Sequence, residues 1–246
     1  MQKLKQLYRS NYTGEQVITD LTLKDGDWHP VSERVPNSVF TTHTTTQAIA
    51  IGNGETRLEF DLRHLDNHKA GLGGANRLQS YGCNALYRNF APDFLIATGD
   101  DVIREIAASG YCRDHIVYSN ADSVMKYPQQ FYLVPQNIYF DSGALAAYMA
   151  AFDGHTKVFL LGFDSYDISQ PVNNVYKNTP GYPMDVIEQN HAYWAISLAN
   201  VISIYPEVEF VRIMPTLDWY MPDHLVGLTN LRQITFRDFV LEADIG

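Results

Sequence analysis

Residues 49–57 read Ile-Ala-Ile-Gly-Asn-Gly-Glu-Thr-Arg, and this stretch decides the fold class that we expect. An apolar run stops at Gly-Asn-Gly, and a charged segment with helical character follows it. This order is typical of a buried parallel strand that passes through a tight turn into a helix. Glycine permits the sharp turn and leaves space for a ligand, and backbone N–H groups at a helix start favour phosphate. Gly-Asn-Gly is also an ordinary strand-end turn, so other segments must support a nucleotide site here.

The same succession of strand, turn and helix repeats along the rest of the chain. The expected strands are residues 47–52, 77–83, 93–98, 115–119, 131–134, 157–162 and 207–213. The expected helices are residues 55–66, 100–109, 142–153 and 185–204, with a short helix around 236–242. This alternation predicts a Rossmann-like α/β fold, with a mostly parallel sheet and helices on both faces. Ligands on such sheets bind beyond the carboxyl ends of the strands.

The first 46 residues have a different pattern. Residues 17–23 alternate imperfectly, Asp25 and Gly26 form a turn signal, and residues 28–35 can return as a second strand. We therefore expect a β-hairpin extension over residues 1–46, followed by a Rossmann-like domain over 47–246. An exposed hairpin edge is a ready pairing surface, so the extension offers a route to a homo-oligomer.

Composition excludes several classes of protein. Of 246 residues, 46% are apolar and 19% are charged, which is a globular composition with enough length for one core. The net charge of −10 argues against general nucleic-acid binding. No run of about 18 apolar residues predicts a membrane span. We see no apolar leader at the N-terminus, and the two cysteines are too few for a disulfide framework, so we expect a cytoplasmic protein.

Small and amide-bearing residues occur in four segments where we expect strands to end. They are Gly52-Asn53-Gly54, Cys83-Asn84, Asp141-Ser142-Gly143 and Gly162-Phe163-Asp164. Turns need such residues, so any one segment alone is ordinary. Four of them along one sheet edge favour a binding site. Residues 164–184, rich in Asn, Pro, Gly and Tyr, predict a lid or long surface loop beside it.

His191 is the candidate for acid–base chemistry. It lies in a helical segment after the expected lid, and a neutral imidazole can accept a proton from a hydroxyl group. Because the chain has eight histidines, a partly buried structural histidine is the alternative. No His or Cys pair has metal-ligand spacing, so we expect no metal site. Walker A and Gly-x-Ser-x-Gly patterns are absent from the sequence.

Together these segments resemble the single-domain bacterial sialyltransferases that use CMP-sialic acid. Residues 51–56 resemble that family's Gly-Asn-Gly-Pro-Ser nucleotide loop, and residues 83–87 are similar to its Cys-Asn-x-x-Tyr segment. Residues 142–143 are similar to its Thr-Ser-Gly turn, and residues 161–166 to its strand ending Gly-Ile-Asp-Phe-Tyr. The resemblance runs from about residue 48 to residue 215 and is carried by these short motifs.

The resemblance implies a role for each matching residue. His191 falls on the general base, and Tyr166 on the tyrosine that helps to hold the leaving phosphate. The residues implied to bind the donor nucleotide sugar are Asn53, Gly54, Thr56, Asn84, Ser142, Gly143 and Asp164. The implied activity is a metal-independent glycosyltransferase that needs no cofactor. It would use a nucleotide sugar, foremost a CMP-linked acidic sugar, and a carbohydrate or glycoconjugate acceptor.

The motif set also resembles a wider superfamily, which includes motility-associated glycosyltransferases and an archaeal pterin pyrophosphokinase. One alternative is therefore a Mg-ATP-dependent pyrophosphokinase, with Asp100, Asp101 and Asp164 as carboxylates for the metal. The segment Tyr-Gly-Cys-Asn-Ala-Leu-Tyr is moreover similar to uncharacterised proteins of marine bacteriophages. A second alternative is a non-catalytic phage or host-interaction protein that keeps the fold, located in the host cytoplasm.

Overall fold

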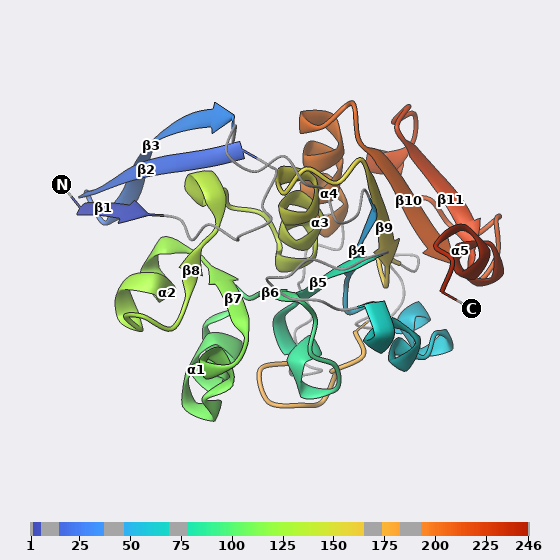
Figure 1. Ribbon diagram of the computed structural model, residues 1–246, viewed down its shortest axis with the longest axis horizontal. Coiled ribbons are helices and arrows are strands. Elements are labelled where there is room, and N and C mark those ends of the chain that lie inside the picture. The colour runs from blue at the N-terminus through green and yellow to red at the C-terminus, as the bar shows by residue number, and fades with distance from the viewer. Residues whose placement is uncertain are drawn as a thin grey trace.

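Eight parallel strands form the central sheet of the computed structural model, in the order β11-β10-β9-β4-β5-β6-β7-β8 (Figure 1). The structure describes residues 2–5, 15–36, 47–68, 78–164, 174–182 and 193–245. The strands are β4 (Gln47–Ile51), β5 (Gln79–Cys83), β6 (Phe94–Ile96), β7 (Ile116–Ser119), β8 (Tyr132–Leu133), β9 (Lys157–Leu161), β10 (Glu209–Met214) and β11 (Leu231–Thr235). The expected Rossmann-like α/β fold is confirmed.

Helices cover both faces of this sheet. They are α1 (Asp100–Ser109), α2 (Ala121–Lys126), α3 (Ser142–Phe152), α4 (Tyr193–Ile204) and α5 (Phe236–Glu242). Residues of α3 and α4 share one buried cluster with Ala48 and Ala50 of β4. Residues of α1 and α5 share the other cluster with Ile49 and Ile51 of the same strand. A strand buried on both faces reads as a continuous apolar run, which is why residues 48–51 have that character.

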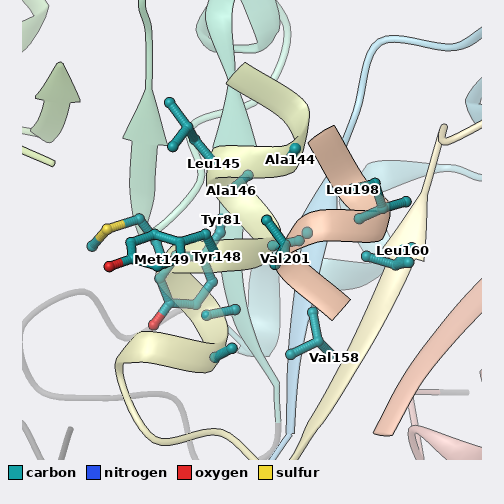
Figure 2. Close-up of a cluster of buried hydrophobic side chains, with 14 of the residues drawn as sticks. Tyr81, Ala144, Leu145, Ala146, Tyr148, Met149, Val158, Leu160, Leu198 and Val201 are labelled. Carbon is teal, nitrogen blue, oxygen red and sulfur yellow. The ribbon is translucent and has the colours of Figure 1, made fainter. Parts of the chain in front are cut away.

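Helix α3 is the central helix of the first cluster (Figure 2). Every residue from Ala144 to Phe152 is buried, as is usual for a helix that is hydrophobic all round. The alanines of α3 and the small side chains of Ala48 and Ala50 permit a close packing of helix on sheet. Asp141 caps the helix, because its side chain accepts hydrogen bonds from the first-turn amides. The helix expected over residues 142–153 is thereby confirmed.

The N-terminal residues form a separate antiparallel sheet of β1 (Gln2–Lys5), β2 (Glu15–Lys24) and β3 (Asp27–Pro36). Asp25 and Gly26 connect β2 to β3 and both have positive φ angles, 54° and 88°. Such angles fit the tight turns that join twisted hairpin strands. The predicted hairpin is confirmed, and β1 adds a third strand. The sheet lies beside η6 (Pro135–Asn137), near the β8 end of the molecule (Figure 1).

One expectation for the central domain was wrong, and one strand was missed. The segment 55–66 was expected to form one helix, whereas the structure has two 3-10 helices, η1 (Glu55–Glu59) and η2 (Leu62–His68). Phe60 between them has an extended backbone, with φ −116° and ψ 126°. In addition, strand β11 was not expected, because its sequence LRQIT is mostly polar and lacks the apolar run of the inner strands. Its parallel pairing with β10 at the sheet edge explains that pattern.

The helices of the described ranges include none that is both long and apolar enough to span a lipid bilayer. Helix α4 begins at Tyr193, and the first part of the helix expected over 185–204 lies outside the described residues.

The carboxyl ends of β4 and β9 approach each other through glycine. A Cβ atom on Gly52 would lie 2.5 Å from the carbonyl oxygen of Gly162, and one on Gly54 would lie 1.9 Å from Oδ1 of Asp164. Gly162 has a φ of +73°, which side chains other than glycine rarely adopt. The glycines of both turns are therefore required for the contact between these two strand ends.

The substitution Gly54→Ala tests this close approach. We expect it to lower the free energy of unfolding by about 1–3 kcal/mol or to prevent folding, as overpacking does. The Cβ would meet both the Asp164 side chain and, at 2.7 Å, the backbone oxygen of Gly162. Gly99→Ala is the control, because nothing lies within 4 Å of a Cβ there. Urea denaturation followed by circular dichroism measures both variants, and equal stabilities would contradict the close approach.

Candidate functional site

The candidate site lies where the strand order of the sheet reverses. From β4 the chain moves outward through β5 to β8, and it then returns to β9, on the other side of β4. Parallel sheets bind ligands at such a switch point, beyond the carboxyl ends of the two strands. The Gly52–Gly54 turn follows β4, and Gly162 to Asp164 follow β9. Two of the predicted segments are therefore neighbours at this edge.

A buried hydrogen-bonded pair joins these two segments. The hydroxyl of Thr56 donates to Oδ1 of Asp164 at 2.6 Å, and the Thr56 amide donates to Oδ2 at 3.3 Å. The carboxylate thus occupies the first turn of η1. This contact ties the start of η1 to the turn after β9.

Backbone hydrogen bonds also tie the two turns together. The amide of Gly52 donates to the Leu161 oxygen at 2.8 Å, and the amide of Gly54 donates to the Gly162 oxygen at 3.0 Å. These two N–H groups are therefore used within the protein. A short 3-10 helix such as η1 has only a small dipole at its N-terminus, so positive charge at this turn comes from a side chain.

Arg57 supplies that charge. Its Nη1 donates to the Gly52 oxygen at 2.8 Å and to Oδ1 of Asn53 at 3.0 Å, and its Nη2 donates to the Tyr176 hydroxyl at 3.2 Å. Sequence reasoning missed this residue, because an arginine just after a turn reads as solvent-exposed. The available signal was its position three residues after Gly54, in the same stretch that decides the fold.

A second hydrogen-bonded group lies at the end of β5. Oδ1 of Asn84 accepts from the Ser142 hydroxyl at 3.0 Å and from the Thr98 amide at 3.3 Å, and the Thr98 and Ser142 hydroxyls are 2.6 Å apart. Two donors on one oxygen fix the orientation of the Asn84 amide. Asn84 also has a φ of +46°, a left-handed conformation that asparagine tolerates better than most residues. Such local strain is often kept at binding sites.

The carboxylate of Asp141 lies at the start of α3. Oδ1 of Asp141 accepts from the amides of Gly143 at 2.6 Å and Ala144 at 3.1 Å. Burial raises the pKa of Asp141, and these two amides oppose that rise. Burial likewise raises the pKa of Cys83 to about 12. The negative charge of Asp141 contributes to this rise, and the positive charge of Arg57 opposes it. The Cys83 thiol is therefore within electrostatic range of both charged groups.

The described part of the predicted lid, residues 174–182, lies against the Gly52–Gly54 turn. The Val175 amide donates to the Asn53 oxygen at 2.8 Å. Lys177 forms an ion pair with Glu55. Farther along the segment, Arg88 donates to Oγ1 of Thr179 at 2.8 Å. Residues from the lid segment thus cover the turn and Arg57.

The predicted site residues fall into two groups and a remainder. Asn53, Gly54, Thr56 and Asp164 surround the β4–β9 contact, whereas Asn84, Ser142 and Gly143 surround the junction of β5 with α3. Phe163 connects the groups, since a Cβ on Gly143 would lie 3.4 Å from its ring. His191 and Tyr166 lie outside the described residues. The described helix after His191 starts at this edge, where Trp194 contacts Phe163 with ring centroids 6.5 Å apart.

The carboxylates considered for a metal do not gather at the site. Asp100 and Asp101 are exposed in the first turn of α1, and Asp101 pairs with Arg104 at 3.1 Å. Within the described ranges, no group of three or more His, Cys, Asp or Glu residues is arranged to hold a metal ion.

The sheet, its switch point and the polar side chains at the strand ends define a Rossmann-like α/β protein. Compared with protein families, with curated proteins and with solved structures, the chain has no match.

Removal of the Thr56 hydroxyl tests the pair that joins the two turns. Thr56→Val removes the 2.6 Å hydrogen bond to the buried Asp164 carboxylate, so we expect a loss of about 1–3 kcal/mol in the free energy of unfolding. Thr56→Ser keeps the hydroxyl and should lose less. Chemical denaturation of both variants decides the point, and a valine variant more stable than the serine variant would refute this role.

The raised thiol pKa values predict slow alkylation of the native protein. Burial raises the pKa of Cys83 to about 12 and that of Cys112 to about 11. Since only the thiolate reacts and an unfolded cysteine has a pKa near 8.5, both should react at least about 100-fold more slowly at pH 8 than in urea. Mass spectrometry after timed iodoacetamide treatment measures the rates. Rapid native labelling of Cys83 would show that this thiol is accessible and ionised.

Proposed function

We propose that the chain binds a nucleotide-activated sugar at the carboxyl edge of its sheet and transfers the sugar to an acceptor. The observation that supports this most is the convergence of separate predicted segments on the β4–β9 switch point. The turn after β4, the turn after β9 and the start of α3 contact one another through Thr56, Asp164 and Phe163. Parallel α/β sheets bind nucleotides at this kind of place.

The proposed donor is a CMP-linked acidic sugar, and the proposed acceptor is a carbohydrate or glycoconjugate. Both follow from the resemblance to CMP-using sialyltransferases. In that role Asn53 and Gly54 would lie beside phosphate and ribose, with Thr56 and Asp164 holding the turn. Ser142 and Gly143 would lie beside the donor sugar and help to orient it.

Asn84 has the clearest part in this proposal. Among the described residues, both hydrogen bonds of its side chain are accepted by the amide oxygen, and its NH₂ group has no acceptor there. An amide fixed in this way presents two N–H donors to a ligand. Oxygen and nitrogen acceptors on a nucleotide base, or the oxygens of a sugar acid, would accept from it.

The proposed reaction needs one proton acceptor and one stabilised leaving group. His191 would take the proton of the acceptor hydroxyl as its oxygen attacks the anomeric carbon of the sugar. The bond from that carbon to the phosphate oxygen breaks, and CMP leaves with the electron pair. Tyr166 would donate a hydrogen bond to the departing phosphate.

A thermal-shift screen with and without Mg²⁺ tests the nucleotide class. We expect CMP and CMP-sugars to raise the melting temperature without metal, because binding to the native state stabilises it by mass action. A response to ATP that requires Mg²⁺ would instead support the pyrophosphokinase alternative. No response to any nucleotide or nucleotide sugar at millimolar concentration would contradict the proposal and favour a non-catalytic protein.

Variants of two asparagines separate binding from stability. Asn84→Ala should weaken CMP binding about 10-fold or more, as expected for a lost pair of ligand hydrogen bonds. Asn120 is the matched control, because it also follows a strand at this edge but caps α2 by accepting from the Ser123 amide at 2.9 Å. Asn120→Ala should cost about 1 kcal/mol of stability and leave CMP affinity unchanged. Isothermal titration with both variants measures this, and equal affinities would refute the role of Asn84.

His191→Ala tests the chemical step. Transfer from a CMP-sugar should fall by about 100-fold or more, whereas CMP affinity should stay near the wild-type value, because a general base acts on the acceptor rather than on the nucleotide. A coupled assay for released CMP measures the rate. Undiminished turnover would assign the base to another residue.

A further inference from the structure

The guanidinium of Arg57 is a buried positive charge with neutral partners. Arg57 is only 3% exposed to solvent. The acceptors of its hydrogen bonds are the Gly52 carbonyl, the Asn53 amide and the Tyr176 hydroxyl. No carboxylate of the described residues forms an ion pair with it. A buried charge is costly to leave without an opposite charge, so this arrangement points to an anion that binds there.

Arg88 shows the contrast within the same part of the molecule. Both guanidinium groups lie near the ring of Tyr176, Arg57 at 5.4 Å and Arg88 at 5.7 Å from its centroid. Arg88 forms an ion pair with Glu105 and also donates to Thr179 and to the Pro180 oxygen. Arg88 is therefore neutralised and serves to hold the 174–182 segment. Arg57 holds the same segment without being neutralised.

The nearby carboxylates have other partners. Asp164 is bonded to Thr56, and its charge acts on the guanidinium of Arg212. Asp141 is bonded to the amides at the start of α3. Their existing contacts leave the charge of Arg57 to be met by a ligand.

The donors of Arg57 also fit an anion. A guanidinium has five N–H groups, and the three hydrogen bonds above use three of them. The Nε–H and one Nη2–H group have no acceptor among the described residues. Two N–H groups of one guanidinium can bind two oxygens of a phosphate in parallel. The Tyr176 hydroxyl, which accepts from Nη2, can still donate its own proton to such a ligand.

We propose that Arg57 is the phosphate-binding residue of this site and that it takes the phosphate of the bound nucleotide. This inference rests on the proposed function for the identity of the nucleotide, but the anion site itself is defined by Arg57. In this proposal, a buried side chain beside Gly52 and Asn53 supplies the positive charge that binds the phosphate at the Gly52–Gly54 turn.

Isothermal titration with CMP and with cytidine, which lacks the phosphate, tests the inference. The wild-type protein should bind CMP at least about 10-fold more tightly than cytidine, and this preference should shrink as salt is raised. Arg57→Met should lose most of the preference, by about 10- to 100-fold, while its affinity for cytidine stays within about threefold. Arg57→Lys should be intermediate, because it keeps the charge but lacks the planar pair of donors.

Arg88→Met is the matched control. It removes an arginine that also contacts Tyr176, so a merely structural effect on the 174–182 segment would appear in this variant too. The CMP preference should persist in it. Circular dichroism and melting temperatures establish that each variant is folded before titration.

The outcomes separate this inference from the proposed function. If the wild-type protein binds CMP and cytidine equally, or if Arg57→Met keeps the full preference, the role of Arg57 is overturned although nucleotide binding stands. This comparison in the wild-type protein needs no variant to fold. If no nucleotide binds but inorganic pyrophosphate does, and Arg57→Met abolishes that binding, the anion site stands and the proposed function fails. Absence of binding by nucleotides and pyrophosphate alike overturns both.

Discussion

The close approach of two parallel strand ends, after β4 and after β9, is the constraint on which the rest of the structure depends. Gly52 and Gly162 are in backbone contact, and a side chain on either residue would meet the main chain of the other. Only with that approach can the Gly52 and Gly54 amides reach the carbonyl oxygens of β9 and its turn. The topology of the sheet therefore places a glycine contact at the position where a ligand is expected.

The same contact determines how charge is arranged. The amides of the turn after β4 are used between the two strand ends, and the Asp164 carboxylate is hydrogen-bonded to Thr56. Arg57 is the positively charged group beside that turn. On the other side, Asn84 and Ser142 fix each other at the start of α3. This edge of the sheet thus combines the buried cation of Arg57 with the oriented amide of Asn84, whose N–H groups can donate to a ligand. The 174–182 segment, held by Arg88, covers the turn. A phosphate attached to a polar base would complement this set of groups.

Much of the fold could be predicted from the sequence, because inner parallel strands are continuous apolar runs. Residues 48–51 and 158–161 are such runs. The alanine-rich run of α3 likewise predicts a buried helix. Strand β11 could not be found in this way, because this edge strand is mostly polar and only one of its residues is buried. The 3-10 helix after Gly54 could not be found either, because Asp164, 108 residues away, contacts its first turn.

At the proposed site, the sequence predicted several of the residues that the structure brings together, but not all of the groups found there. Asn53, Thr56 and Asp164 come together as the strand-end pattern predicts, and so do Asn84 and Ser142. Arg57 was missed because local pattern places a charged residue on the surface, whereas its burial depends on Tyr176, 119 residues later. A crystal structure with CMP tests the central claim most directly. Our account predicts the phosphate against Arg57 and the nucleoside toward Asn84; CMP bound away from the β4–β9 switch point would contradict it.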